Sequence, residues 1–150
     1  MSKTWEATHI ALVIVACLGA IVLARREHDT NTPEAYVPYL RGVLACDPDV
    51  KIHWLTLAAD ADPNFAQVYR YRSLGYIEKN EHDRAIQDCT RAIQLKPDYP
   101  EAYNVRAITH YLKRDYDRAW ADARMTKKLG GEILPEGFLT QLRQASGRSE

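Results

Sequence analysis

Histidine and cysteine supply many of the metal ligands and nucleophiles of proteins, and both are widely scattered in this sequence. No histidine has a second histidine three to five residues away, and no two cysteines form a CxxC pair. A zinc site or a disulfide framework is therefore not indicated. We expect Cys46 and Cys89 to be packed thiols, and His82 and His110 to have structural roles. The residues concerned are His9, His28, His53, His82 and His110, with Cys17, Cys46 and Cys89.

Other catalytic signatures are also missing from the sequence. It contains no GxGxxG, GxxxxGK[ST], HExxH or GxSxG motif and no calcium-binding loop. Carboxylates such as Asp115, Asp117 and Asp122 are expected at helix starts or on a solvated helical face. Lys+Arg and Asp+Glu are both 20, so the chain lacks the basic excess of a nucleic-acid binder. We expect a non-catalytic protein without cofactor, metal, nucleic acid or small-molecule substrate.

An apolar segment near the N-terminus is the strongest single feature of the composition. Residues 10–24 carry no charge, and residues 5–24 match the roughly 20 residues that a helix needs to cross a bilayer. Trp5 suits the interfacial belt, and Arg25 and Arg26 form an abrupt polar end. The segment predicts a single-pass N-terminal transmembrane helix.

We therefore assign residues 1–26 to a membrane anchor and residues 27–33 to a short polar linker. A cleaved signal peptide and lipidation at Cys17 remain open alternatives, because each also begins with an apolar run. Lysine and arginine are similarly few on both sides of the segment, so the side of the membrane on which the remainder lies stays undecided.

The remainder of the chain repeats itself with a period of 34 residues. A shift of 34 aligns nine identical residues over 63–129, and such a period is typical of stacked helical hairpins. The pairs are Pro63 and Pro97, Tyr69 and Tyr103, Arg72 and Arg106, Lys79 and Lys113, Asp83 and Asp117, Arg84 and Arg118, Ala85 and Ala119, Asp88 and Asp122, and Leu95 and Leu129.

The repeat predicts helices at about 67–79, 83–95, 101–113 and 117–129. Small residues recur where two antiparallel helices must approach closely, at Ser73, Ala85, Ala107 and Ala119. Acidic residues recur where the second helix of each pair starts, which favours its dipole. Asp98 is expected to cap the helix that follows it, and Gly130-Gly131 to end the last repeat.

These residues resemble the tetratricopeptide-repeat (TPR) family, whose repeats carry an aromatic, two small residues and a proline at set positions. The resemblance implies an all-α TPR-type helix-turn-helix solenoid, with two clear repeats over 63–130. A degenerate repeat is expected over 34–62, where Tyr39 and Lys51 occupy the small-residue positions and Pro38 should interrupt the first helix. Residues 131–150 should form a capping helix and tail, with Phe138, Leu139 and Leu142 as its apolar face.

The resemblance also implies a partner-binding groove along the first helix of each repeat. It would take an apolar extended or helical segment of another protein, although these positions could instead pack against the linker or another subunit. A C-terminal carboxylate clamp is incomplete, because Leu74 and Val105 stand where asparagines are expected. A membrane-anchored adaptor is the first interpretation, and a permanent structural subunit or a transient assembly factor is the alternative. The aligned positions are Tyr36, Arg70 and Asn104, then Leu40, Leu74 and Ile108, then Val43, Ile77 and Tyr111.

Overall fold

The computed structural model describes residues 33–131 and 136–147, and within them it shows seven α-helices. The helices are α2 (Pro33–Leu44), α3 (Pro48–Ala61), α4 (Ala66–Glu78), α5 (His82–Leu95), α6 (Pro100–Leu112), α7 (Tyr116–Lys128) and α8 (Glu136–Ser146). None of these described helices is long and apolar enough to cross a membrane. The predicted anchor, residues 5–24, lies outside the described residues.

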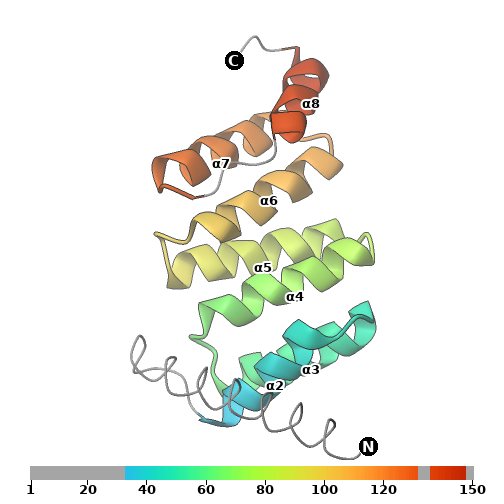
Figure 1. Cartoon of the computed structure of the whole chain (residues 1–150), viewed down its shortest axis with the longest axis vertical. Coiled ribbons are helices and arrows are strands. Elements are labelled where there is room, and N and C mark those ends of the chain that lie inside the picture. Colours follow the sequence, from blue (N-terminus) through green and yellow to red (C-terminus); the bar gives the residue numbers. More distant parts are fainter. Residues whose placement is uncertain (1–32, 132–135, 148–150) are drawn as a thin grey trace, which may run out of the picture. The chain divides into compact units, whose positions relative to one another are not determined.

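The helices pair as hairpins, α2 with α3, α4 with α5 and α6 with α7. The hairpins follow one another in a stack, with α8 against the last of them (Figure 1). α4 and α6 start 34 residues apart, at residues 66 and 100, and α3, α5 and α7 start at residues 48, 82 and 116. The predicted TPR-like solenoid is thus confirmed, and each of the four predicted helices begins one residue earlier than expected.

The helix ends follow from local chemistry. The side chain of Asp47 accepts a hydrogen bond from the Val50 N–H at 2.9 Å and caps α3, and Asp115 caps α7 in the same way. The cap predicted at Asp98 is wrong, because Tyr99 is the N-cap of α6 and Pro100 occupies the first turn with its preset φ. Gly130 follows α7 with a φ of 70°, a left-handed geometry that ends the helix as expected.

The first hairpin departs from the prediction at Pro38. Helix α2 continues through this residue, which lies in its second turn. A proline there removes one backbone donor, the one that would have bonded the carbonyl of Glu34. Packing against α3 and α4 is enough to hold the helix together despite that loss.

Small side chains allow the hairpins to close, but the first hairpin uses different ones. Ser73, Ala85, Ala107 and Ala119 are each fully buried, as their positions predict. In the first hairpin Tyr39 and Lys51 are half-buried instead, and Gly42 makes the close approach. A Cβ on Gly42 would lie 2.5 Å from Cγ of Leu55 on α3. Glycine is thus required there by packing.

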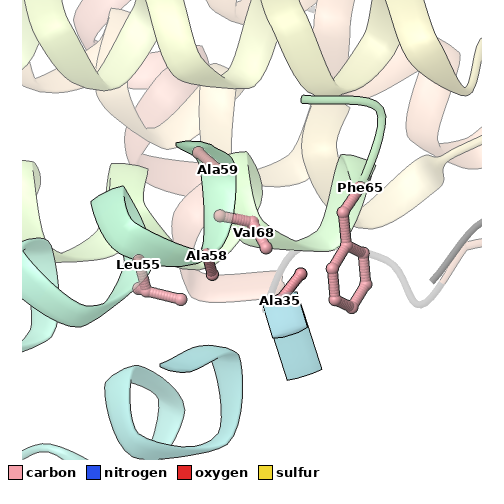
Figure 2. Packing of buried hydrophobic residues seen from close by; sticks show 6 residues of the cluster. All are labelled: Ala35, Leu55, Ala58, Ala59, Phe65 and Val68. Carbon is pink, nitrogen blue, oxygen red and sulfur yellow. The ribbon is translucent and has the colours of Figure 1, made fainter. Parts of the chain in front are cut away.

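The core continues from one hairpin to the next. Buried residues of α2, α3 and α4 form one cluster, in which Phe65 and Val68 join the second hairpin to the first (Figure 2). At the other end Leu142 of α8 is fully buried against Ala119 and Trp120, with Phe138 and Leu139 beside it. Helix α8 therefore covers the last hairpin, as a cap should.

Candidate functional site

The nine positions predicted to form a groove lie on the first helices of the three hairpins, α2, α4 and α6. All nine are half-buried, and α4 contacts both α2 and α6. We call these positions the first-helix face. It consists of Tyr36, Leu40 and Val43 on α2, Arg70, Leu74 and Ile77 on α4, and Asn104, Ile108 and Tyr111 on α6.

Arg70 is the charged residue of the first-helix face, and its side chain is held in place. Its Nε donates a hydrogen bond to the hydroxyl of Tyr99 at 2.8 Å. The guanidinium carbon lies 3.9 Å from the centroid of the Tyr71 ring, a cation–π geometry. Burial raises the pKa of Tyr99, against the opposing effect of Arg70, so the hydroxyl stays protonated near neutral pH. A fixed guanidinium can recognise a carboxylate with little loss of side-chain entropy.

Aromatic residues around Arg70 form a cluster that the sequence analysis missed. The ring of Tyr39 lies 4.8 Å from that of Phe65 and 5.7 Å from that of Tyr71, centroid to centroid. Tyr36 lies 6.0 Å from Tyr39. Burial, together with the neighbouring tyrosines, raises the pKa of Tyr39. The sequence did contain a sign of this cluster. Tyr39 occupies a position where the repeat has a small residue, and other side chains must make room for its large ring.

The chain itself occupies the α6 end of the first-helix face. The Tyr111 ring lies 5.0 Å from that of Phe138 on α8, and 5.9 Å from that of Tyr116. Ile108 and two α8 residues, Phe138 and Leu139, all pack against the cluster of Ala107 and Ala123. Helix α8 thus lies beside Ile108 and Tyr111. The alternative expected for the face, packing against the linker or another subunit, stays a prediction.

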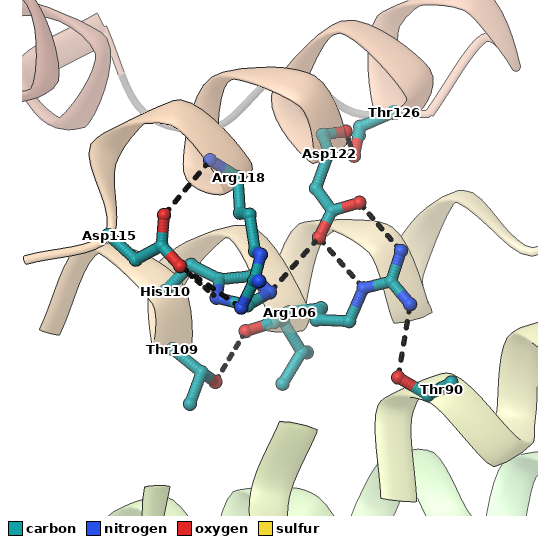
Figure 3. A network of polar contacts seen from close by, with 9 residues as sticks. Thr90, Arg106, Thr109, His110, Asp115, Arg118, Asp122 and Thr126 are labelled. Atoms are coloured by element: carbon teal, nitrogen blue, oxygen red, sulfur yellow. Dashed lines mark hydrogen bonds and ion pairs between the residues drawn. The ribbon is translucent and has the colours of Figure 1, made fainter. Parts of the chain in front are cut away.

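Two buried ion pairs repeat at the 34-residue period. Arg72 donates two hydrogen bonds of 2.8 Å to Asp88, and its third contact is the Thr56 hydroxyl at 3.2 Å. Arg106 does the same with Asp122 and Thr90, at 2.8 Å and 3.1 Å (Figure 3). Each arginine thereby joins the second helix of its own hairpin to the second helix of the hairpin before.

The expectation that Asp122 lies on a solvated face is wrong, since only 5% of the residue is exposed. The hydrogen bonds that Arg106 donates to Asp122 raise the pKa of Arg106, so this guanidinium remains charged. The identical spacing of Arg72 to Asp88 and of Arg106 to Asp122 was the signal for these pairs. Each ion pair joins the two helices of one hairpin, and the hydrogen bond from the arginine to Thr56 or Thr90 adds a link to the hairpin before.

His110 is buried beside the second ion pair. Its Nδ1 lies 3.9 Å from a carboxylate oxygen of Asp115, and its Nε2 lies 4.0 Å from one of Asp122. Burial lowers the pKa of His110, although both carboxylates oppose that effect. The structural role expected for His110 agrees with this position between α6 and α7 (Figure 3).

The two described cysteines differ from each other. Cys89 is fully buried and donates to the Ser73 hydroxyl at 3.2 Å, and burial raises its thiol pKa to about 12. Such a thiol is inert. Cys46 is exposed in the turn between α2 and α3, so its predicted packing is wrong. Within the described ranges, no three histidine, cysteine or acidic residues are grouped as metal ligands would be.

Comparison with known proteins identifies the fold of the described residues. No family model matches the chain, and no curated protein matches it either. Solved TPR domains do match. The first TPR domain of Spaghetti (RPAP3), bound to an HSP90 peptide, is 23% identical with a TM-score of 0.72, over 77% of this chain and 94% of that one.

Two further structures give the same result. The TPR domain of Arabidopsis OM64 is 23% identical with a TM-score of 0.72, over 76% of this chain and 98% of that one. The TPR2B domain of yeast Sti1, in a complex with Hsp70, is 20% identical with a TM-score of 0.65, over 76% and 94%. The described residues therefore have the TPR-repeat fold.

Proposed function

We propose that this protein is a non-catalytic, membrane-anchored adaptor that binds another protein through the first-helix face. The observation that carries the proposal is the line of half-buried apolar side chains on α2 and α4, since α8 packs beside the apolar face residues of α6. Similar structures include TPR domains bound to peptides of HSP90 and Hsp70, which supports the same class of role here. Apolar side chains that are neither fully buried nor fully exposed can still bury area against a partner.

The residues of the face define the chemistry of the partner segment. Leu40, Leu74 and Ile77 favour apolar side chains, and Asn104 offers an amide for one or two hydrogen bonds. Arg70 uses Nε on Tyr99, and its two terminal nitrogens can donate to a carboxylate of the partner. We infer an extended or helical segment that is mainly apolar and carries one acidic group.

A chaperone C-terminal tail is not the partner that we propose. Leu74 cannot donate a hydrogen bond, and Val105 is 7% exposed, so neither replaces the asparagines expected in a carboxylate clamp. The proposed partner therefore depends on apolar contacts rather than on a fully bound terminal carboxylate.

The proposal includes membrane attachment through residues 5–24, which is supported by the sequence of that segment. The full chain should stay with membranes through high-salt and alkaline washing, whereas a chain starting at Asp29 should be released. Appearance of the full chain in the wash supernatant would contradict the anchor. A mature N-terminus at Cys17 would favour lipidation instead.

Affinity capture from detergent-solubilised membranes tests the binding role. Leu74→Asp places a charge in the middle of the first-helix face and should remove bound proteins while leaving helicity unchanged, because Leu74 is not part of the buried core. Arg124→Glu on the exposed surface of α7 is the matched control. Capture that survives Leu74→Asp but is lost in the control would place the interaction elsewhere.

The captured fraction also separates the alternative functions. A permanent structural subunit should carry its partner in a fixed ratio through high salt. A transient assembly factor should release its client under the same conditions.

A further inference from the structure

The first hairpin exposes apolar side chains on the surfaces of α2 and α3 that point away from the core. Val37 and Leu44 of α2 are 55% and 78% exposed, and Val50 and Leu57 of α3 are 45% and 40% exposed. Each pair is spaced seven residues apart, so its two members lie on one side of their helix. Leu112 is the remaining large hydrophobic residue with such exposure among the described residues, and it lies on α6.

A contact between the two helices joins these four side chains into one patch. The guanidinium of Arg41 lies 4.6 Å from the centroid of the Trp54 ring. Arg41 is one helical turn from both Val37 and Leu44, and Trp54 is one turn from both Val50 and Leu57. The exposed surfaces of α2 and α3 therefore adjoin. We call this patch the outer face, and it consists of Val37, Arg41, Leu44, Val50, Trp54 and Leu57.

The outer-face positions on α3 have a different character in the second hairpin, and those on α2 differ only in part. Leu44 corresponds to Glu78 and then to the exposed Leu112, and Val37 to Tyr71 and Val105. A shift of 34 residues replaces Val50 by Arg84 and Leu57 by Arg91, and both arginines are exposed. A second shift replaces Val50 by Arg118, which is also exposed, and Leu57 by Met125. The TPR fold thus tolerates arginine at these sites. The apolar outer face belongs to the first hairpin, and it is not a requirement of the fold.

The position of the outer face in the chain indicates what covers it. The uncharged run ends at residue 24 and α2 begins at Pro33, which leaves eight residues, 25–32, between them. Eight extended residues reach at most about 26–29 Å. If residues 5–24 anchor the chain as proposed above, the first hairpin is the part of the domain that must stay close to the bilayer.

We propose that the outer face lies in the interfacial region of the bilayer. The four aliphatic side chains would enter the boundary between headgroups and acyl chains. Trp54 and Arg41 suit that depth, because a tryptophan ring and a long basic side chain both place an apolar part inward and a polar part at the headgroups. Asp49 is paired with Lys79, and the exposed Asp60 offsets the charge of Arg41, so the outer face has no basic excess for anionic lipid and a zwitterionic surface is proposed.

This inference rests on the proposed anchor and can be tested separately from it. The full chain, with Cys17→Ala and Cys46→Ser, would be reconstituted in phosphatidylcholine vesicles and spin-labelled at Leu44→Cys. Cys89 is fully buried and should stay unlabelled. Collisions of the label with oxygen, which enters lipid, and with a neutral nickel chelate, which stays in water, would be measured by power saturation. Arg124→Cys on α7 supplies the aqueous reference.

A label at residue 44 should lose its nickel collisions and keep its oxygen collisions, whereas the label at residue 124 should keep both. Val50→Arg and Leu57→Arg would introduce the residue type that the second hairpin has at the equivalent positions. Together they should restore the nickel collisions of the label at residue 44 without changing the circular dichroism. Leu112→Arg should leave them unchanged.

Three results would overturn the proposal. Nickel collisions as frequent at residue 44 as at residue 124, in a chain that floats with the vesicles, would refute the membrane contact and leave the anchor standing. Loss of both kinds of collision would mean that a second copy or another protein covers the face. A chain that does not float with the vesicles would refute both the anchor and the contact.

Discussion

Arg106 donates two hydrogen bonds to Asp122 with little access to water, and the two side chains are 19% and 8% exposed. Truncating one partner would leave the other charge buried and unpaired, which is costlier than losing an exposed pair. The exposed pair of Lys113 with Asp83, which links the third hairpin to the second, provides the comparison.

Arg106→Ala should lower the free energy of unfolding by about 3 kcal/mol, and Lys113→Ala by less than about 1 kcal/mol. Thermal melting of the full chain in detergent, followed by circular dichroism, checks this difference. Equal shifts in melting temperature for the two variants would show that the buried pair contributes no more than a surface one.

His110 should make stability depend on pH. Burial holds its pKa below the ordinary value of 6.5, so the unfolded chain binds this proton more readily than the folded chain. Stability conferred by neutral His110 is therefore present above about pH 6.5 and is lost as the pH falls toward the folded pKa. The facing charges are Asp115 and Asp122, which oppose the shift, and Arg106 and Arg118, which add to it.

The full chain should melt at a lower temperature at pH 5.5 than at pH 7.5, and His110→Gln should reduce that difference. The other described histidines, His53 and His82, remain in the variant, so it isolates the contribution of His110. An identical pH dependence in the two chains would assign the effect to other groups.

Single residues were predictable from the sequence where the repeat restricts them to one type. Ala85 and Ala119 are buried at helix crossings as expected, because only a small side chain fits there. The burial of Asp122 and the exposure of Cys46 were not predictable in this way. Each depends on which neighbouring side chain lies opposite, and the helical period alone does not give that.

At the scale of helices, the first hairpin reverses the size pattern of the other two. Gly42 stands where the second and third hairpins have Tyr76 and His110, and Leu55 stands where they have Cys89 and Ala123. The larger side chain has moved from the first helix to the second. Glycine within a helix costs about 1 kcal/mol relative to alanine, and here the buried Leu55 requires it.

Gly42→Ala should therefore destabilise the protein by about 1–3 kcal/mol, although alanine favours helix formation. Leu55→Ala should also destabilise it, by leaving a cavity. The double variant should cost less than the sum of the two, because the new methyl group enters the space that Leu55 leaves. Strict additivity in chemical denaturation would show that the two residues do not share this contact.

The four helices of the two clear repeats were predictable to within one residue at their starts, since the 34-residue period and the small-residue positions together fix the register. The fate of Pro38 was not predictable from its local effect. The hydrogen bond that Pro38 removes destabilises only the helix itself. The packing of α2 on α3 and α4 stabilises the helix by more than this loss.

At the scale of the whole domain, the described hairpins present two surfaces of different origin. The first-helix face was predicted from the resemblance to TPR proteins, and the period aligned its positions across the three hairpins. The outer face arises from residues in which the first hairpin differs from the others. The repeat pattern identifies residues that the hairpins share, so it cannot predict a surface made of residues that differ. The contact of Arg41 with Trp54 in the structure was needed to define the outer face.

The central claim is that the first-helix face binds another protein, and photo-crosslinking in intact cells tests it most directly. A photoreactive amino acid at position 40, 74 or 104, all half-buried on that face, would be compared with one at the exposed position 124. The account predicts a discrete protein adduct from the first-helix positions and none from position 124. Adducts formed from position 124 and from no first-helix position would contradict it.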